Sequence, residues 1–208
     1  RHHAVCVRSA LRGMGPRQQC EEMLLDVFVS GAELLSDDEL VPFGLSRTGV
    51  VGYFFMLREI ELSTMLFENV EVNRVDKKVE ILLPATKTDP LALSCTRSWG
   101  CVCPDGVSDV RTCPYHAAEK QKDELMVKFG DAVGAEGFPF SPTHAGKTVT
   151  KDRMVASFQK IATKKGLATH TKAGKKKFTG QMFRVAGSRH MMRHGVQVPP
   201  IMSMARWE

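Results

Sequence analysis

The stretch TGQMFRVAGSRHMMRHGV occupies residues 179–196 and is the most informative part of the sequence. We expect it to form one helix from about residue 180 to 195, since Gly195 is a typical helix stop. Arg184 falls in the first turn, where a cation opposes the helix dipole. This placement is better explained if a phosphate lies nearby, because a helix N-terminus also favours an anion. The segment therefore indicates an anion site at the start of a late helix.

Hydrophobic periodicity predicts the elements around this segment. Three- and four-residue spacing of apolar residues predicts helices over 17–31 and from Thr150, as the N-cap, to Gly166. The apolar run 50–62 predicts a buried helix with Arg58 near its end. Alternation of Val70 and Val72, and of Val79, Ile81 and Leu83, around a turn at Asp76–Lys78 predicts a β-hairpin.

Three further segments carry candidate site residues. MLREIEL at 56–62 contains Arg58, ATKTDP at 85–90 contains Lys87, and ARW at 205–207 contains Trp207. Taken singly, each residue has a plain structural explanation. Arg58 can pair with Glu59 or Glu61 at a helix end, Lys87 can be a solvated strand-end lysine, and Trp207 can be a core residue.

Taken in order, these segments resemble the active site of the tyrosine recombinases, the phage-integrase family. Arg58 with Glu61 and Leu62 is similar to the family's LR-x-x-EL helix, and Lys87 to its hairpin lysine, often found within S-K-T-D. The run from Gln181 to Gly187 resembles the box T-G-H-x-x-R-V-x-G-A. Trp207 resembles the final His or Trp donor of a G-[HR]-W segment.

The resemblance implies a mainly helical α+β catalytic domain with a small antiparallel β-hairpin or sheet. It implies DNA strand breakage and rejoining, as in site-specific recombination or integration by a mobile element, with double-stranded DNA as the partner. Arg58 and Arg184 would clamp the phosphate, Lys87 would protonate the leaving 5′ hydroxyl, and Trp207 would donate its indole N–H. No metal or nucleotide cofactor is implied for catalysis. A parent protein would assemble as a homotetramer on DNA, and we expect this chain to be a monomer.

The chain departs from the family pattern in two places. Gln181 replaces the usual His or Lys of the second box, and an amide cannot accept a proton at neutral pH. The family's nucleophilic tyrosine follows the Trp207 position, whereas Tyr53 and Tyr115 precede the second box and are expected to be buried. We therefore expect a chain truncated before its nucleophile that forms no phosphotyrosine link. The alternative is a non-catalytic DNA-binding remnant of a decayed mobile element.

The family resemblance also suggests a division of the chain. We expect residues 1–45 to be a remnant of an N-terminal helical region and 46–208 to be the catalytic-type domain, with a Cys-rich insertion of little periodicity at 91–116. The sequence begins at Arg1 without an initiator Met, so we expect it to be part of a longer protein. His190 and His194 share a helix face about two turns beyond Arg184, and we propose neither as a base.

Charge is distributed unevenly. From residue 141 to 208 there are 14 Lys and Arg against 2 Asp and Glu, whereas residues 1–140 carry 15 basic and 21 acidic groups. A basic C-terminal third is typical of a face that meets a polyanion. A solvated loop is the alternative for its lysine-rich segment 163–177. The candidate DNA-backbone contacts are Lys164, Lys165, Lys172, Lys175, Lys176 and Lys177.

No signal peptide and no bilayer-length apolar run occur, so we expect no membrane association and an intracellular protein, nuclear if eukaryotic.

Four of the six cysteines lie close together in sequence. Cys101-x-Cys103 and Cys113-x-x-His116 offer four ligands that suit a structural, tetrahedral zinc, with Cys95 as a substitute ligand. The alternative is a plain C-P-x-x-A helix start that needs no metal, as in many phage-type integrases. A zinc-stabilised interaction module with no DNA role is a third functional possibility, which the basic C-terminal third disfavours.

Overall fold

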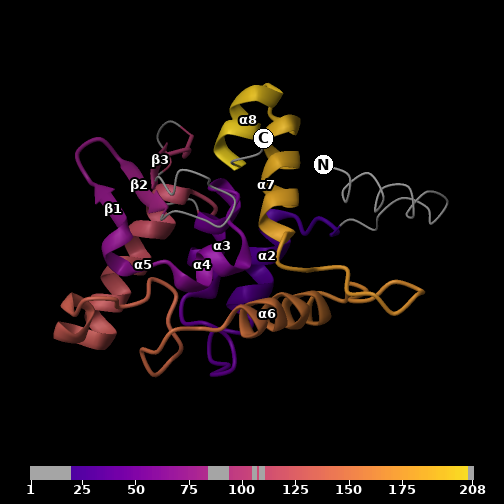
Figure 1. Ribbon diagram of the computed structural model, residues 1–208, viewed down its shortest axis with the longest axis horizontal. Helices are drawn as coiled ribbons and strands as arrows, with labels where there is room; N and C mark the ends of the chain where they lie inside the picture. The colour runs from indigo at the N-terminus through magenta and orange to yellow at the C-terminus, as the bar shows by residue number, and fades with distance from the viewer. Residues whose placement is uncertain (1–19, 84–93, 105–106, 108–110, 206–208) are drawn as a thin grey trace, which may run out of the picture.

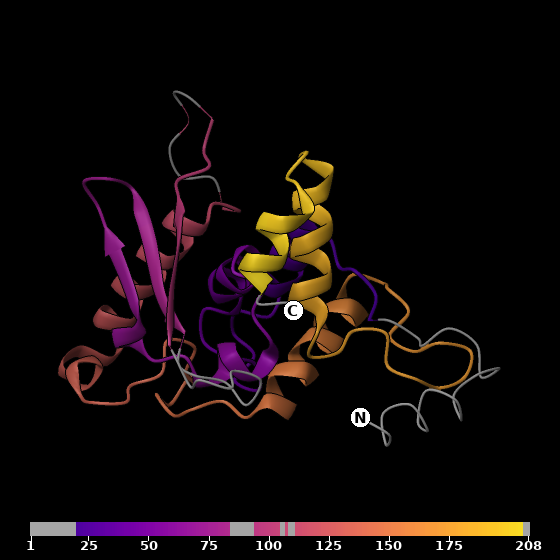
Figure 2. The same cartoon turned by 45° about the horizontal axis from the view of Figure 1, so that its top comes forward.

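The computed structural model describes residues 20–83, 94–104, 107 and 111–205. Its helices are α2 (Leu25–Glu33), α3 (Leu45–Phe54), α4 (Glu59–Thr64), α5 (Pro114–Phe129), α6 (Lys151–Lys164), α7 (Met182–Arg193) and α8 (Val198–Ala205). Two short 3-10 helices, η1 (Phe67–Asn69) and η2 (Gly130–Gly134), and three strands, β1 (Val70–Asn73), β2 (Lys78–Leu83) and β3 (Cys95–Gly100), complete the described elements. Figures 1 and 2 show the sheet and α5 on one side of α3, and α7 with α8 on the other.

Helix α3 lies at the centre of the core because it is buried on nearly every side. Around it, an edge-to-face aromatic cluster joins three helices: Phe28 of α2, Phe158 of α6 and Phe183 of α7 have ring centroids 5.0–6.2 Å apart. A Cβ atom at Gly187 of α7 would lie 2.2 Å from the carbonyl oxygen of Tyr53. Glycine at this position therefore allows α7 to approach the α3 backbone.

The segment 50–62 is not the single helix that its apolar pattern predicts. Helix α3 ends at Phe54, and Met56 has a left-handed backbone with φ of 49°. Helix α4 then begins at Glu59 with Arg58 as its N-cap. Arg58 therefore lies at a helix start and not at a helix end, because the chain turns sharply at Met56.

The sheet is antiparallel in the order β1-β2-β3. The predicted hairpin is confirmed, with Val70 opposite Ile81 and Val72 opposite Val79. β3 lies within the segment where the sequence showed little periodicity, and it pairs with β2 along its whole length. Helix α5 packs against all three strands, and the indole N–H of Trp99 in β3 donates to the Phe54 carbonyl at 3.0 Å, which ties the sheet to α3.

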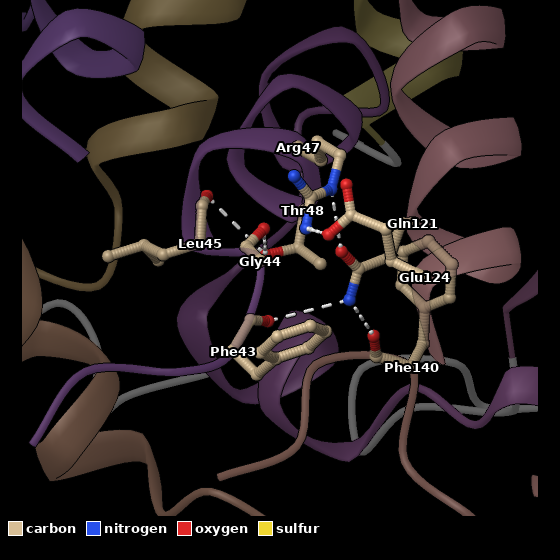
Figure 3. A network of polar contacts seen from close by, with 8 residues as sticks. All are labelled: Phe43, Gly44, Leu45, Arg47, Thr48, Gln121, Glu124 and Phe140. Atoms are coloured by element: carbon tan, nitrogen blue, oxygen red, sulfur yellow. Dashed lines mark hydrogen bonds and ion pairs between the residues drawn. The ribbon is translucent and has the colours of Figure 1, made fainter. Parts of the chain in front are cut away.

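A buried polar network joins α3 to α5 (Figure 3). The amide of Gln121, which is fully buried, donates to the Phe140 carbonyl at 2.9 Å and accepts from Arg47 Nε at 3.1 Å. Arg47 also pairs with Glu124. Gly44 has φ of 68°, and a Cβ there would lie 1.9 Å from the Gln121 oxygen, so this turn requires glycine.

The other predicted helices agree with the structure with one exception near the start of the described chain. The Thr150 hydroxyl accepts from the Arg153 N–H at 3.2 Å, which confirms it as the N-cap of α6. Helix α2 begins only at Leu25, because the preceding residues run beside the segment before α7: the Glu21 N–H donates to the Lys177 carbonyl at 2.8 Å. The expected mainly helical α+β architecture with a small antiparallel sheet is confirmed.

Within the described residues, the helices are too short or too polar to cross a bilayer.

Candidate nucleic-acid interface and active-site residues

Arg58 and Glu61 form the start of α4. Arg58 has an extended backbone, and its N–H donates to Glu61 Oε2 at 2.7 Å, as in the second half of a capping box. Glu61 thus bonds the backbone of Arg58 and not its guanidinium. Among the residues that the structure describes, the half-exposed Arg58 guanidinium makes no ion pair or hydrogen bond. Its charge is therefore available to an acceptor outside the described chain.

Arg184 lies in the first turn of α7, as predicted, but it is buried. Its side chain is 4% exposed, and its Nη2 lies 3.3 Å from both oxygens of the Glu61 carboxylate, which is 9% exposed. A buried guanidinium needs such a partner because an uncompensated charge in the interior is costly. Glu61 therefore joins the two candidate clamp arginines, through a backbone contact to Arg58 and an ion pair to Arg184.

The turn before α7 rests directly on the start of α4. The Glu59 N–H donates to the Gly180 carbonyl at 3.2 Å, and a Cβ at Gly180 would lie 1.9 Å from the Glu59 carboxyl carbon. A side chain at Gly180 would therefore require the Glu59 carboxylate to move. This close contact places Gln181, the exposed N-cap of α7, at the same junction. Lys87 and Trp207 lie outside the described residues.

Neither tyrosine of the sequence is available as a nucleophile. Tyr53 is 1% exposed and Tyr115 is 4% exposed, which confirms the expectation that both are buried. Tyr115 donates to Glu119 at 2.9 Å, and burial together with this carboxylate raises the pKa of Tyr115 to about 12. Both phenols therefore stay protonated near neutral pH.

The two histidines of α7 lie away from Arg184. The His190 ring packs against the rings of Tyr53 and Phe54, and the His194 Nδ1 lies 2.9 Å from the His190 carbonyl. Burial is the main cause that lowers the pKa of His190. His190 is therefore part of the α3–α7 interface, whereas His194 is the exposed C-cap of α7 and contacts His190.

The lysine-rich segment between α6 and α7 extends away from the body (Figures 1 and 2). It folds back on itself through hydrogen bonds from Thr171 to Lys175 and from Lys177 to Thr169, each 2.9 Å long. Lys164, Lys172, Lys175 and Lys176 are exposed, whereas Lys165 and Lys177 are half-buried. Lys177 pairs with Glu21 at 3.0 Å, so it anchors the segment to the body.

The candidate metal ligands come together as the sequence predicts. Cys101, Cys103, Cys113 and His116 each offer one ligand atom, and these atoms all lie within 4.8 Å of one another. The first two ligands follow β3, and the last two belong to the N-cap and first turn of α5. Cys95 lies at the opposite end of β3, opposite Leu83, and is not part of this group.

Comparison with known proteins is informative at the level of structure. No family model and no curated protein sequence matches the chain. Among solved structures, it is similar to the site-specific recombinase XerH bound to difH substrate in a pre-cleavage complex, with a TM-score of 0.59, 10% identity, and coverage of 88% of this chain and 46% of that chain. It is also similar to XerH bound to palindromic difH substrate in a post-cleavage complex, with a TM-score of 0.61, 11% identity, and coverage of 94% and 48%.

The fold is therefore tyrosine-recombinase-like. The chain spans about half the length of the XerH chains that it matches. At this level of identity the likeness concerns the fold, and the activity has to be argued from the residues.

Proposed function

We propose that this chain binds double-stranded DNA and provides the phosphate clamp of a tyrosine-recombinase-type active site, whose reaction is DNA strand breakage and rejoining. The observation that carries the proposal is the junction of α4 and α7, where Glu61 links Arg58 to Arg184. These residues occur in the family's order on a fold similar to that of a DNA-bound recombinase.

The chemistry of the junction suits a phosphodiester. Phosphoryl transfer spreads negative charge over the non-bridging oxygens, which planar guanidinium groups stabilise with paired hydrogen bonds. In this scheme Arg58 supplies the exposed positive charge, and Glu61 fixes the orientation of Arg184 while offsetting part of its charge. Lys87 would be the general acid and Trp207 an N–H donor, and Gln181 would contact the phosphate without acting as a base.

The lysine-rich segment would add contacts to the DNA backbone. Its exposed lysines, Lys172, Lys175 and Lys176, lie close together in sequence on a segment that extends away from the body, which suits a non-specific electrostatic contact. Assembly of a parent protein as a homotetramer on DNA, and a nuclear location in a eukaryotic host, belong to the same proposal.

A second candidate function is DNA binding without strand cleavage. Two observations favour it: Gln181 stands where a base is usual, and both tyrosines are buried. Cleavage through a phosphotyrosine would require a hydroxyl other than those of Tyr53 and Tyr115. The two functions share the clamp and differ only in the covalent step.

Binding to a labelled DNA duplex at fixed, low salt tests the phosphate clamp that both candidate functions share. We expect Arg58→Ala to weaken binding roughly tenfold, the effect of losing one charge-assisted contact to phosphate. Arg74→Ala is the matched control because Arg74 is exposed and pairs with Glu119 and Asp123. Equal affinity of wild type and Arg58→Ala, with unchanged thermal stability, would exclude the clamp.

A nicked suicide substrate, incubated with a longer parent protein that contains this chain, separates the two candidates, because neither tyrosine of the chain itself is available as a nucleophile. A denaturant-resistant protein–DNA adduct would support strand cleavage, and mapping of the linked residue would identify the nucleophile. Duplex binding with no adduct, under conditions in which XerH-type recombinases react, would support the non-catalytic function.

A further inference from the structure

We propose that Cys101, Cys103, Cys113 and His116 form a structural zinc site that fastens the end of β3 to the start of α5. This site is independent of the proposed DNA function, since none of its ligands belongs to the clamp. It was suggested by sequence spacing alone, and the geometry of the four side chains now supplies the argument.

The distances between the ligand atoms match the edges of a zinc tetrahedron. With Zn–S bonds of about 2.3 Å, two thiolates on one tetrahedral zinc lie about 3.8 Å apart, and a thiolate and an imidazole nitrogen lie about 3.6 Å apart. The Sγ atoms of Cys113 and Cys101 are 3.7 Å apart. The His116 Nδ1 lies 3.9 Å from Cys101 Sγ and 3.3 Å from Cys103 Sγ. These three distances are close to the tetrahedral values, and all four ligand atoms lie within 4.8 Å of one another, as a closed structural zinc site requires.

The two ligand pairs are also tied to each other through the main chain. Cys113 is the N-cap of α5. The Val102 N–H donates to Cys113 Sγ at 3.4 Å. A divalent ion would displace the thiol protons on binding and offset most of the charge of the three thiolates.

The alternatives explain the geometry less well. Buried thiols can pack as small apolar groups and donate weakly to an imidazole nitrogen, but neither interaction draws three sulfurs and that nitrogen to one point. A disulfide between Cys101 and Cys113 would require the sulfurs to approach to about 2.05 Å and would leave Cys103 and His116 unused.

Zinc binding would stabilise this region in place of a hydrophobic core. The chain between the two ligand pairs is largely polar. Its described residue Val107 is about half exposed, as is Val102, which lies between the first two ligands. The Cys101 N–H donates to the Lys77 carbonyl at 2.8 Å, so the first ligand is held by the β1–β2 turn. Zinc would join this fixed point to α5, which packs against the whole sheet.

Elemental analysis and cobalt substitution of the 208-residue chain test the proposal. We expect about one zinc per chain after purification without chelators, as for a closed four-ligand site. Cobalt added to the reduced, zinc-free protein should give the thiolate charge-transfer band and the intense visible bands of tetrahedral coordination. Cys103→Ser and His116→Gln, at two of the three half-buried ligands, should lose most of the bound zinc and weaken the cobalt bands.

Cys95→Ser is the matched control, because Cys95 is a half-buried cysteine of the same strand outside the cluster. It should keep its zinc. Wild-type protein that holds well under one equivalent of zinc and gives no cobalt–thiolate band would overturn the proposal. So would equal zinc loss in Cys95→Ser, or two oxidised thiols in a metal-free native protein. The cobalt titration of the wild type tests for the four-ligand metal site even if a variant fails to fold.

Discussion

Glu61 contacts both candidate clamp arginines. The sequence pattern suggested that it is a motif residue or a helix-end partner of Arg58. In the structure it accepts the Arg58 N–H and pairs with Arg184, a residue on a different helix. Spacing within one helix can predict local pairs, but it cannot predict a contact made by tertiary packing. Arg58 and Arg184 were therefore found from sequence, and the link between them was not.

We expect Glu61→Gln to lower the free energy of unfolding by about 2–4 kcal/mol, because it leaves the buried Arg184 charge without a compensating carboxylate. Chemical denaturation measures this change. Glu71→Gln, on the exposed face of β1, is the control and should have little effect.

The double variant Glu61→Leu/Arg184→Met should lose less free energy of unfolding than the sum of its single variants. Strict additivity would show that the two side chains do not interact.

Helices and strands were predictable where burial alternates along the chain. Strand β2 alternates buried and more exposed residues, and α6 has an apolar face and a Thr150 cap, so both were predicted. In β3 the more buried face carries Arg97 between Cys95 and Trp99, so hydropathy does not alternate with burial, which explains why the strand was missed. The break between α3 and α4 was missed because every residue from Val51 to Leu57 is buried, so periodicity carries no information there.

The proposed contact of the lysine-rich segment between α6 and α7 with the DNA backbone can be tested by its salt dependence. Lys175 and Lys176 are both exposed, and each phosphate contact contributes about 0.9 to the slope of log affinity against log salt. The double variant Lys175→Ala/Lys176→Ala should therefore reduce that slope by about two units. Duplex binding at a series of salt concentrations measures it.

The control for this test is Lys147→Ala/Lys151→Ala, which removes two exposed charges from the other end of α6. If both double variants change the slope equally, the effect is one of net charge and not of this segment.

At the scale of the whole molecule, the aromatic cluster places α2 in the same core as α6 and α7. Phe28 is fully buried between Phe158 and Phe183, and a Cβ at Gly49 of α3 would lie 1.9 Å from its ring. Residues 1–45 are expected from the sequence to be a remnant of an N-terminal helical region, and that division stays a prediction. The packing of Phe28 gives a direct way to test whether α2 unfolds with the rest.

We expect Phe28→Ala to destabilise the whole described fold by about 3–5 kcal/mol, because it removes a large buried ring and leaves a cavity. Circular dichroism and the fluorescence of a Trp207→Phe background, in which Trp99 of β3 is the remaining tryptophan, should report the same shifted transition. A loss of some helix signal with an unshifted fluorescence transition would show that α2 unfolds separately.

The four-ligand cluster after β3 also affects how this fold can be modified. The Sγ atoms of Cys101 and Cys113 lie 3.7 Å apart, so the two ends of the segment between them lie close together. Lengthening a loop whose ends are already held together costs little, roughly 0.6 kcal/mol per doubling. The segment between Cys103 and Cys113 is thus a natural position for a genetically encoded reporter or an affinity tag, carried by the protein without separating the sheet from α5.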